Sequence, residues 1–228
     1  MGSGLEGSPT FAFQAGDGND DFYIGGMKIQ PLPDGYKDGI ALIGDSTMAG
    51  SSAGFDATNA REFSTFLAGY LNCNVFNRAI GGNKTSDMDN RWESDISPLA
   101  INSRYVIIQG GINDIANGGG LADIQGHINS MVGKAHADGL LPILLTASPT
   151  ASIGENPDYE ATRQQLNAWI LANFQAIDIA ATLADPANPQ FLNPAWAGDG
   201  VHYSIEGKKA AAQVAARWGS WSFISPAP

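Results

Sequence analysis

The chain has 228 residues, of which 43% are hydrophobic and 15% charged, and its mean hydropathy is -0.11. This balance suits one large globular domain and excludes a mostly disordered chain. The formal net charge is -11, and the few basic residues are scattered along the chain. Neither nucleic acid nor an anionic membrane is therefore an expected partner.

The single cysteine, Cys73, excludes an intramolecular disulfide and a cysteine-based zinc site, and we expect it to be a small core residue. No run approaches the ~18 apolar residues of a membrane span, and the N-terminus lacks the pattern of a secretory signal. Residues 1–6 resemble a cloning remnant. The sequence does not indicate a compartment, and an extracellular location would require that a native signal has been removed.

The first part of the chain differs in composition from the rest. Residues 1–38 are rich in Gly, Asp and Pro, whereas apolar and amphipathic segments alternate from Gly39 onward. We predict a leader over residues 1–38 and a folded domain over residues 39–228. Residues 16–26 resemble the Gly/Asp repeats that bind calcium in β-rolls, but such folds need about three copies. We favour a turn-rich leader with a strand or hairpin, and a calcium-stabilised leader is the alternative.

Short apolar runs from Gly39 onward predict buried strands of a parallel sheet, at residues 40–43, 75–76, 105–108, 140–145 and 176–179. Apolar stripes with helical spacing predict helices within residues 62–71, 124–135, 166–174 and 210–218. This alternation predicts an α/β fold, a three-layer α/β/α sandwich with a central five-stranded parallel sheet. Ligands bind at the carboxyl ends of strands in such folds, so the segments after the strands are the candidate site.

A serine follows the first predicted strand, in the turn Gly44-Asp45-Ser46. A nucleophile would stand at this edge of the sheet, although the Gly-x-Ser-x-Gly elbow of ordinary α/β-hydrolases is absent. Considered alone, such a serine is more often a turn or cap residue.

Two further loops could present hydrogen-bond donors. The loop after the second strand contains Gly81 and Gly82, and the loop after the third contains Asn113. Backbone N–H groups and a side-chain amide can together bind a developing oxyanion if they converge on one point. The alternatives are a tight glycine turn and an Asx-turn or helix cap at Asn113.

One of the three histidines is preceded by a carboxylate at short spacing. His127 and His136 lie within a predicted helix and are expected at its surface or boundary, whereas His202 follows Asp199 by three residues. Such an aspartate can accept the imidazole Nδ1–H and leave Nε2 free to take a proton from a serine. The alternative is a turn residue followed by a helix-start residue.

Taken together, these segments resemble the four blocks of the SGNH hydrolases, also called the GDSL family, from Gly39 to the last predicted helix. The matching residues are Gly44-Asp45-Ser46, the glycine loop around Gly82, Gly111-x-Asn113-Asp114 and Asp199-x-x-His202. The resemblance implies a flavodoxin-like fold and a catalytic triad of Ser46 as nucleophile, His202 as base and Asp199 as its orienting group. It also implies an oxyanion hole made by Ser46, Gly82 and Asn113, with Gly81 as the alternative to Gly82, and it implies no metal or organic cofactor.

The resemblance further implies a serine esterase that hydrolyses short-chain carboxylic esters through an acyl-enzyme, with O-acetyl groups on carbohydrates among the candidate substrates. Thr47-Met48-Ala49 after Ser46 is similar to the rhamnogalacturonan acetylesterase branch, whereas Ile112 stands where that branch usually has histidine, and Tyr203 where many relatives have proline. One alternative is a lysophospholipase or thioesterase of the same family. Another is a non-catalytic carbohydrate-binding or phage-type structural module. The sequence does not indicate an oligomeric state.

Overall fold

The computed structural model describes residues 22–24, 27–29, 37–49 and 62–222. The chain divides into two units, Met1–Asp34 and Gly35–Pro228. In the first unit, β1 (Phe22–Ile24) pairs antiparallel with β2 (Met27–Ile29). Most of the segment considered for calcium, and residues 1–6, lie outside the described residues, so the leader and its boundary near Asp38 stay predictions.

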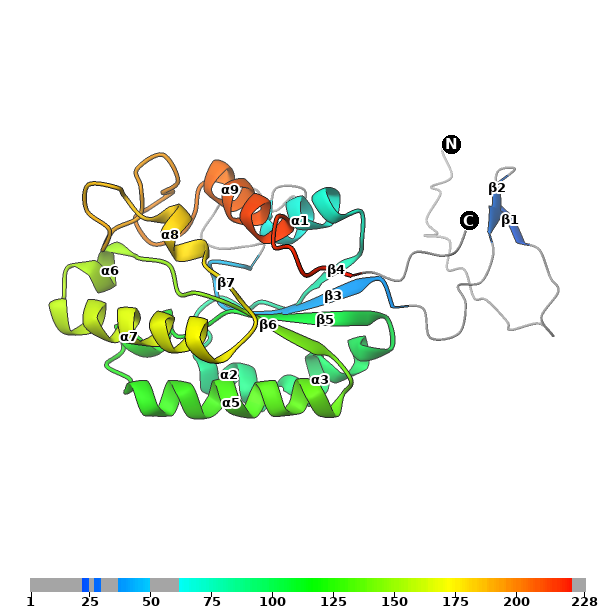
Figure 1. Cartoon of the computed structure of the whole chain (residues 1–228), viewed down its shortest axis with the longest axis horizontal. Coiled ribbons are helices and arrows are strands. Elements are labelled where there is room, and N and C mark those ends of the chain that lie inside the picture. The colour runs from blue at the N-terminus through cyan, green and yellow to red at the C-terminus, as the bar shows by residue number, and fades with distance from the viewer. Residues whose placement is uncertain (1–21, 25–26, 30–36, 50–61, 223–228) are drawn as a thin grey trace, which may run out of the picture. The chain divides into compact units, whose positions relative to one another are not determined.

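The second unit is built on a five-stranded sheet in which every neighbouring pair of strands is parallel (Figure 1). In chain order its strands are β3 (Gly39–Ile43), β4 (Val75–Asn77), β5 (Ser103–Ile108), β6 (Leu141–Leu145) and β7 (Ala176–Ile177). Their order in the sheet is β4-β3-β5-β6-β7. The predicted α/β fold with a five-stranded parallel sheet is therefore confirmed.

Helices cover both faces of this sheet because successive strand residues point to opposite faces. One face packs against α1 (Phe63–Leu71), α8 (Ile179–Leu183) and α9 (Ile205–Ala216), through strand residues such as Ile40 and Leu42. The other, which includes Ala41 and Ile43, packs against α2 (Thr85–Asn90), α3 (Trp92–Asp95), α5 (Leu121–Ala137) and α7 (Pro157–Asn173). The short elements are the 3-10 helix η2 (Ser97–Ile101), α4 (Ile112–Ala116) and α6 (Ala151–Gly154).

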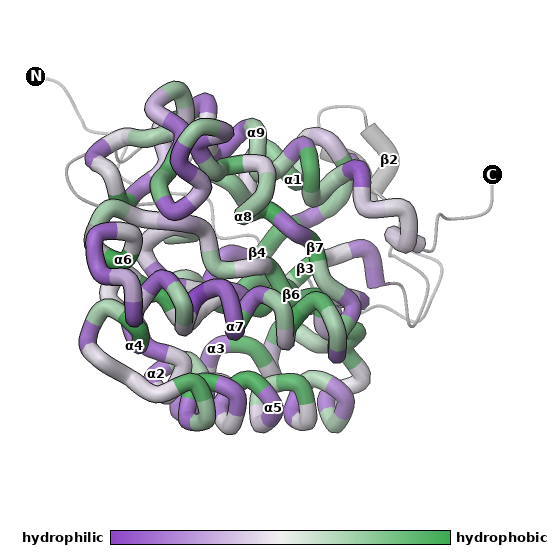
Figure 2. Tube along the Cα trace, turned by 60° about the vertical axis from the view of Figure 1, so that its left-hand side comes forward, coloured by the Kyte–Doolittle hydropathy of each residue, from purple (hydrophilic) through white to green (hydrophobic). Residues whose placement is uncertain are grey.

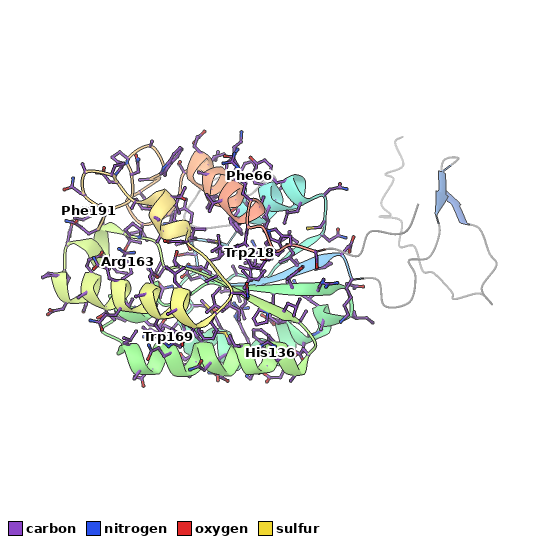
Figure 3. The ribbon with its side chains drawn as sticks, in the orientation of Figure 1. Phe66, His136, Arg163, Trp169, Phe191 and Trp218 are labelled. Atoms are coloured by element: carbon purple, nitrogen blue, oxygen red, sulfur yellow. The ribbon has the colours of Figure 1, made fainter. Side chains whose placement is uncertain are left out.

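The hydropathy of the chain follows these layers. Strands β3 and β6 are hydrophobic at the centre of the unit, whereas α5 and α7 alternate between hydrophobic and hydrophilic turns (Figure 2). Phe66 and Trp218 lie on the side of α1 and α9, and Trp169 and His136 lie on the side of α5 and α7 (Figure 3). Within the described residues, no helix combines the length and the apolar character that a membrane crossing requires.

Two local predictions were wrong. No helix was expected between residues 76 and 105, yet α2, α3 and η2 lie there. Met88, Trp92 and Ile96 are fully buried at a spacing of four residues, a helical signal that the surrounding polar residues obscure. The last strand ends at Ile177 and not at residue 179, because the Asp178 side chain accepts a hydrogen bond from the Ala181 N–H and starts α8.

Candidate active site

The turn that carries Ser46 is held by a buried carboxylate. Asp45 accepts hydrogen bonds from the N–H and the hydroxyl of Thr47, both at 2.8 Å, and from Gln109 Nε2 at 3.3 Å. Burial raises the pKa of Asp45, and the hydrogen bonds from Thr47 and Gln109 only partly offset this effect. Because Gln109 directly follows β5, these contacts fix the turn after β3 to the neighbouring strand and place Ser46 at the carboxyl edge of the sheet.

Asp199 and His202 lie in the loop before α9. Asp199 Oδ1 accepts the backbone N–H groups of Val201 at 3.0 Å and His202 at 2.7 Å, and Oδ2 lies 2.8 Å from His202 Nδ1. Partial burial acts to raise the pKa of Asp199, but the hydrogen bonds from His202 and Val201 together lower it to about 2. The carboxylate is therefore charged at neutral pH and can hold the proton of the imidazole on Nδ1.

His202 and Ser46 are 156 positions apart in the sequence, yet the His202 Nε2 atom lies 3.0 Å from the Ser46 Oγ atom. The three side chains Ser46, His202 and Asp199 thus form one continuous hydrogen-bonded series. With the Nδ1 proton directed at Asp199, the free lone pair of Nε2 faces the Ser46 hydroxyl. This arrangement can take a proton from that hydroxyl as its oxygen attacks an electrophile.

The residues after His202 fix the position of the imidazole. The Tyr203 hydroxyl lies 2.5 Å from Ser148 Oγ in the loop after β6, and burial raises the pKa of Tyr203. Ser204 caps α9 by accepting the Gly207 N–H. Arg163 on α7 donates to the Ala147 carbonyl and so braces the loop that contains Ser148. The backbone that follows His202 is thereby anchored by a buried tyrosine and by the start of a helix.

The glycine loop lies beside Ser46, and Asn113 contacts that loop. Residues Ile80–Asn83 form a tight turn in which Asn83 N–H donates to the Ile80 carbonyl, and Gly82 has φ +79°, a value that favours glycine. A Cβ atom on Gly81 would lie 3.7 Å from Ser46 Cβ, so the loop borders the serine. Among the described residues, the N–H groups of Ser46 and Gly82 have no hydrogen-bond partner.

Asn113 belongs to α4, whose N-cap Gly111 has φ +106° and would clash with Leu166 if it carried a side chain. The Asn113 Nδ2 atom donates one hydrogen bond, of 2.9 Å, to the Asn83 carbonyl. An amide group carries two donor hydrogens, so one remains available. Ser46 N–H, Gly82 N–H and this amide hydrogen are the donors that the candidate oxyanion hole requires.

Sequence reasoning gave no role to a second contact at the same loop. Asp114 accepts the Thr85 N–H at 3.0 Å and the Thr85 hydroxyl at 2.7 Å, and it thereby holds the start of α2 against α4. In the sequence, only the position of Asp114 next to Asn113 could have indicated this contact. The other residues considered lie elsewhere: His127 pairs with Asp89 at 3.0 Å, and burial raises the pKa of the half-buried Cys73 to about 11.

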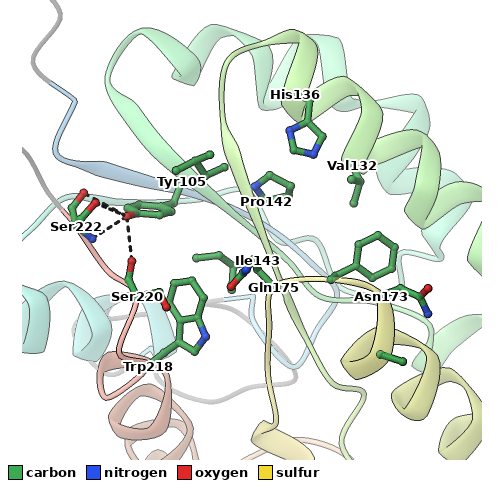
Figure 4. Close-up of a pocket in the computed structure, with 13 residues that line it drawn as sticks. Tyr105, Val132, His136, Pro142, Ile143, Asn173, Gln175, Trp218, Ser220 and Ser222 are labelled. Carbon is green, nitrogen blue, oxygen red and sulfur yellow. Dashed lines mark hydrogen bonds between the residues drawn. The ribbon is translucent and has the colours of Figure 1, made fainter.

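A cavity of about 680 Å³ lies at the opposite end of the strands, bordered by the first residues of β6 and by Tyr105 of β5 (Figure 4). Trp218 and Phe174 also line it, but none of the five predicted site residues does. In the part of the chain that the structure describes, no cluster of three or more His, Cys, Asp or Glu side chains could hold a metal ion. The candidate chemistry is therefore concentrated at the carboxyl edge.

Comparison with known proteins assigns the chain to a family. A model of the GDSL-like lipase/acylhydrolase family matches residues 42–210. The fold is similar to a lipolytic protein of the G-D-S-L family from Desulfitobacterium hafniense DCB-2, with 24% identity and a TM-score of 0.67, over 80% of this chain and 99% of that one. An acylhydrolase from Bacteroides fragilis NCTC 9343 gives 26% identity and a TM-score of 0.63, over 81% and 88% of the two chains.

The fold is also similar to that of Axe2, an acetylxylan esterase from Geobacillus stearothermophilus, at 21% identity and a TM-score of 0.66, over 86% of this chain and 100% of that one. A comparison with curated protein sequences gives no match. The family model spans well over half of the chain, and the α/β fold agrees with it. The chain therefore belongs to the GDSL-like lipase/acylhydrolase family, a membership that implies a carboxylic ester hydrolase.

Proposed function

We propose that this protein is a serine esterase that hydrolyses short-chain carboxylic esters, including O-acetyl groups on carbohydrates, through an acyl-enzyme. The observation that carries the proposal is the series from Asp199 Oδ2 through His202 to Ser46 Oγ, with distances of 2.8 Å and 3.0 Å. A non-catalytic binding module has no use for an imidazole whose free nitrogen faces a serine hydroxyl.

In the proposed reaction, Ser46 Oγ attacks the ester carbonyl carbon while its proton moves to His202 Nε2. The carbonyl oxygen becomes an oxyanion that the N–H groups of Ser46 and Gly82 and the Asn113 amide receive. When the carbon–oxygen bond to the alcohol breaks, the leaving oxygen takes the proton from His202. Water then attacks the acyl-enzyme with His202 as base, which releases the acid and restores the Ser46 hydroxyl.

Two observations support a small acyl group on a polar alcohol. The described groups that contact or border the Ser46 side chain are polar or small, namely His202 and Gly81, and the cavity lined by Trp218 and Phe174 lies at the other edge of the sheet. The structurally similar Axe2 is an acetylxylan esterase. The net charge of -11 also disfavours polyanionic substrates, because like charges repel.

Acyl-chain length tests this proposal. Across p-nitrophenyl acetate, butyrate, octanoate and dodecanoate, we expect kcat/KM to fall at least about tenfold from acetate to octanoate, since the polar or small groups described against Ser46 offer a longer chain little apolar surface that would stabilise its transition state. Release of acetate from acetylated xylo-oligosaccharides is the matching natural-ester assay. A value of kcat/KM that rises with chain length would instead favour the lysophospholipase or thioesterase alternative.

The pH dependence tests the role of the imidazole. His202 must be neutral to accept the Ser46 proton, so acidification removes the active form. Asp199, with its pKa lowered to about 2, stays charged throughout the assay range and adds no second titration. We therefore expect kcat/KM to fall tenfold per pH unit on the acid limb, measured from about pH 8 to pH 4. A kcat/KM that is independent of pH in this range would contradict this assignment, and so would a hundredfold fall per pH unit, which would require two protonations.

A further inference from the structure

Arg91 lies between α2 and α3, outside the four segments that carry the family resemblance, and its side chain is only 14% exposed. Its guanidinium donates from Nε to Asn83 Oδ1 at 2.8 Å and from Nη1 to the Arg78 carbonyl at 2.7 Å. Nη2 makes a longer contact of 3.4 Å with the Gly44 carbonyl. Nη1 also pairs with Asp95 at 2.7 Å.

These contacts join the two loops that border Ser46. Arg78 and Asn83 stand on either side of Gly82, so the guanidinium holds both ends of the glycine loop. Gly44 lies two residues before Ser46, and its carbonyl also accepts the Ile80 N–H at 3.0 Å. Arg91 therefore connects the glycine loop to the turn that carries Ser46.

Asn83 extends this connection to Asn113. The Asn83 side-chain oxygen accepts the Arg91 bond, while the Asn83 backbone carbonyl accepts the 2.9 Å bond from Asn113 Nδ2. The bond from Asn113 fixes the plane of its amide and hence the direction of the second, free hydrogen. If Asn83 moved, both the amide of Asn113 and the N–H of Gly82 would lose their orientation.

We propose that Arg91 is a positioning residue for the oxyanion hole: through Asn83 and the glycine loop it orients the donors on Asn113 and Gly82. This inference rests on the proposed esterase function. Arg91 makes no hydrogen bond to Ser46, His202 or Asp199 among the described contacts, so it acts through other residues. Arginine suits the task because its planar fork reaches several acceptors in fixed directions, which a lysine ammonium cannot do.

The test compares Arg91→Met and Arg91→Lys with the parent protein on p-nitrophenyl acetate. We expect both variants to lower kcat about 10–100-fold with KM within about threefold, because misaligned donors weaken transition-state binding more than substrate binding. Arg91→Lys keeps the charge and can keep the ion pair with Asp95. A lower kcat in Arg91→Lys would therefore show that the planar guanidinium is required. Asp95→Asn removes the charge of that ion pair and keeps one oxygen that can accept the Ser94 hydroxyl, so it should retain kcat near that of the parent.

A double-mutant cycle separates positioning from a general loss of structure. Asn113→Ala alone should lower kcat about 10²–10³-fold. In that background we expect Arg91→Met to lower kcat by a clearly smaller factor than it does in the parent, since the Asn113 amide is already absent and only the Gly82 N–H remains to be misaligned. The inference would be overturned if the loss of kcat in the double mutant equalled the product of the two single losses. An unchanged kcat in either single Arg91 variant would overturn it as well.

Two measurements keep these outcomes distinct. Thermal melting shows whether each variant is folded at the assay temperature. If Arg91→Met is unfolded at that temperature, the kcat of Arg91→Lys tests the role of Arg91. Labelling of the parent by a fluorophosphonate tests the proposed function itself, because it reports on the Ser46 nucleophile. A labelled parent whose Arg91 variants retain full kcat would overturn only the role of Arg91, whereas an unlabelled, inactive parent would overturn the esterase proposal.

Discussion

Ser46→Ala is expected to lower kcat for p-nitrophenyl acetate by at least about 10⁴-fold, because it removes the only atom that can form the acyl-enzyme in the proposed reaction. The substitution deletes one half-buried hydroxyl and leaves the Asp45–Thr47 hydrogen bonds intact. The melting temperature should therefore stay close to that of the parent. Residual activity would come from the oxyanion donors and from binding alone.

A fluorophosphonate provides the second measurement for this variant. Ser46 Oγ would attack phosphorus, fluoride would leave, and His202 would take the hydroxyl proton. We expect one label on the parent and none on Ser46→Ala. Ser130→Ala is a suitable control, since its hydroxyl bonds to Asp89 between α5 and α2 and should not affect labelling. Equal hydrolysis or labelling by Ser46→Ala would refute the assignment of the nucleophile.

The fold was predictable because its strands are short apolar runs. Residues 40–43 and 105–108 are buried on both faces of a covered sheet, so almost every position is hydrophobic and the signal is continuous. The helices between β4 and β5 were missed because their apolar positions are few. Met88, Trp92 and Ile96 are the fully buried hydrophobic residues of that segment, and polar residues that contact neighbouring loops or solvent fill the positions between them.

The candidate site was predictable to the extent that its residues fall in recognisable segments. Spacing alone suggested the local pairing of Asp199 with His202, and the family resemblance proposed their connection to Ser46, which lies 156 positions from His202. No local pattern could reveal Arg91, because two of its loop contacts are to backbone carbonyls, which every residue type carries. The catalytic roles of all five predicted residues stay predictions until variants are assayed.

Asp199→Asn is expected to lower kcat/KM about 10³–10⁴-fold while the loop keeps its shape. The asparagine oxygen can still accept the N–H groups of Val201 and His202, as Asp199 Oδ1 does, so its NH₂ group would face His202 Nδ1. Nδ1 must then act as an acceptor, which moves the imidazole proton to Nε2. A protonated Nε2 would donate to Ser46 Oγ and could no longer take its proton.

The matched control for this variant is Asp185→Asn, because Asp185 makes the same type of bond to the N–H two residues ahead, at 3.0 Å, with no imidazole beside it. It should retain the activity and melting temperature of the parent. A loss of less than tenfold in Asp199→Asn would show that the carboxylate does not set the tautomer of His202. A large loss with normal fluorophosphonate labelling would place its effect after attack by Ser46, in hydrolysis of the acyl-enzyme, and not in activation of the serine.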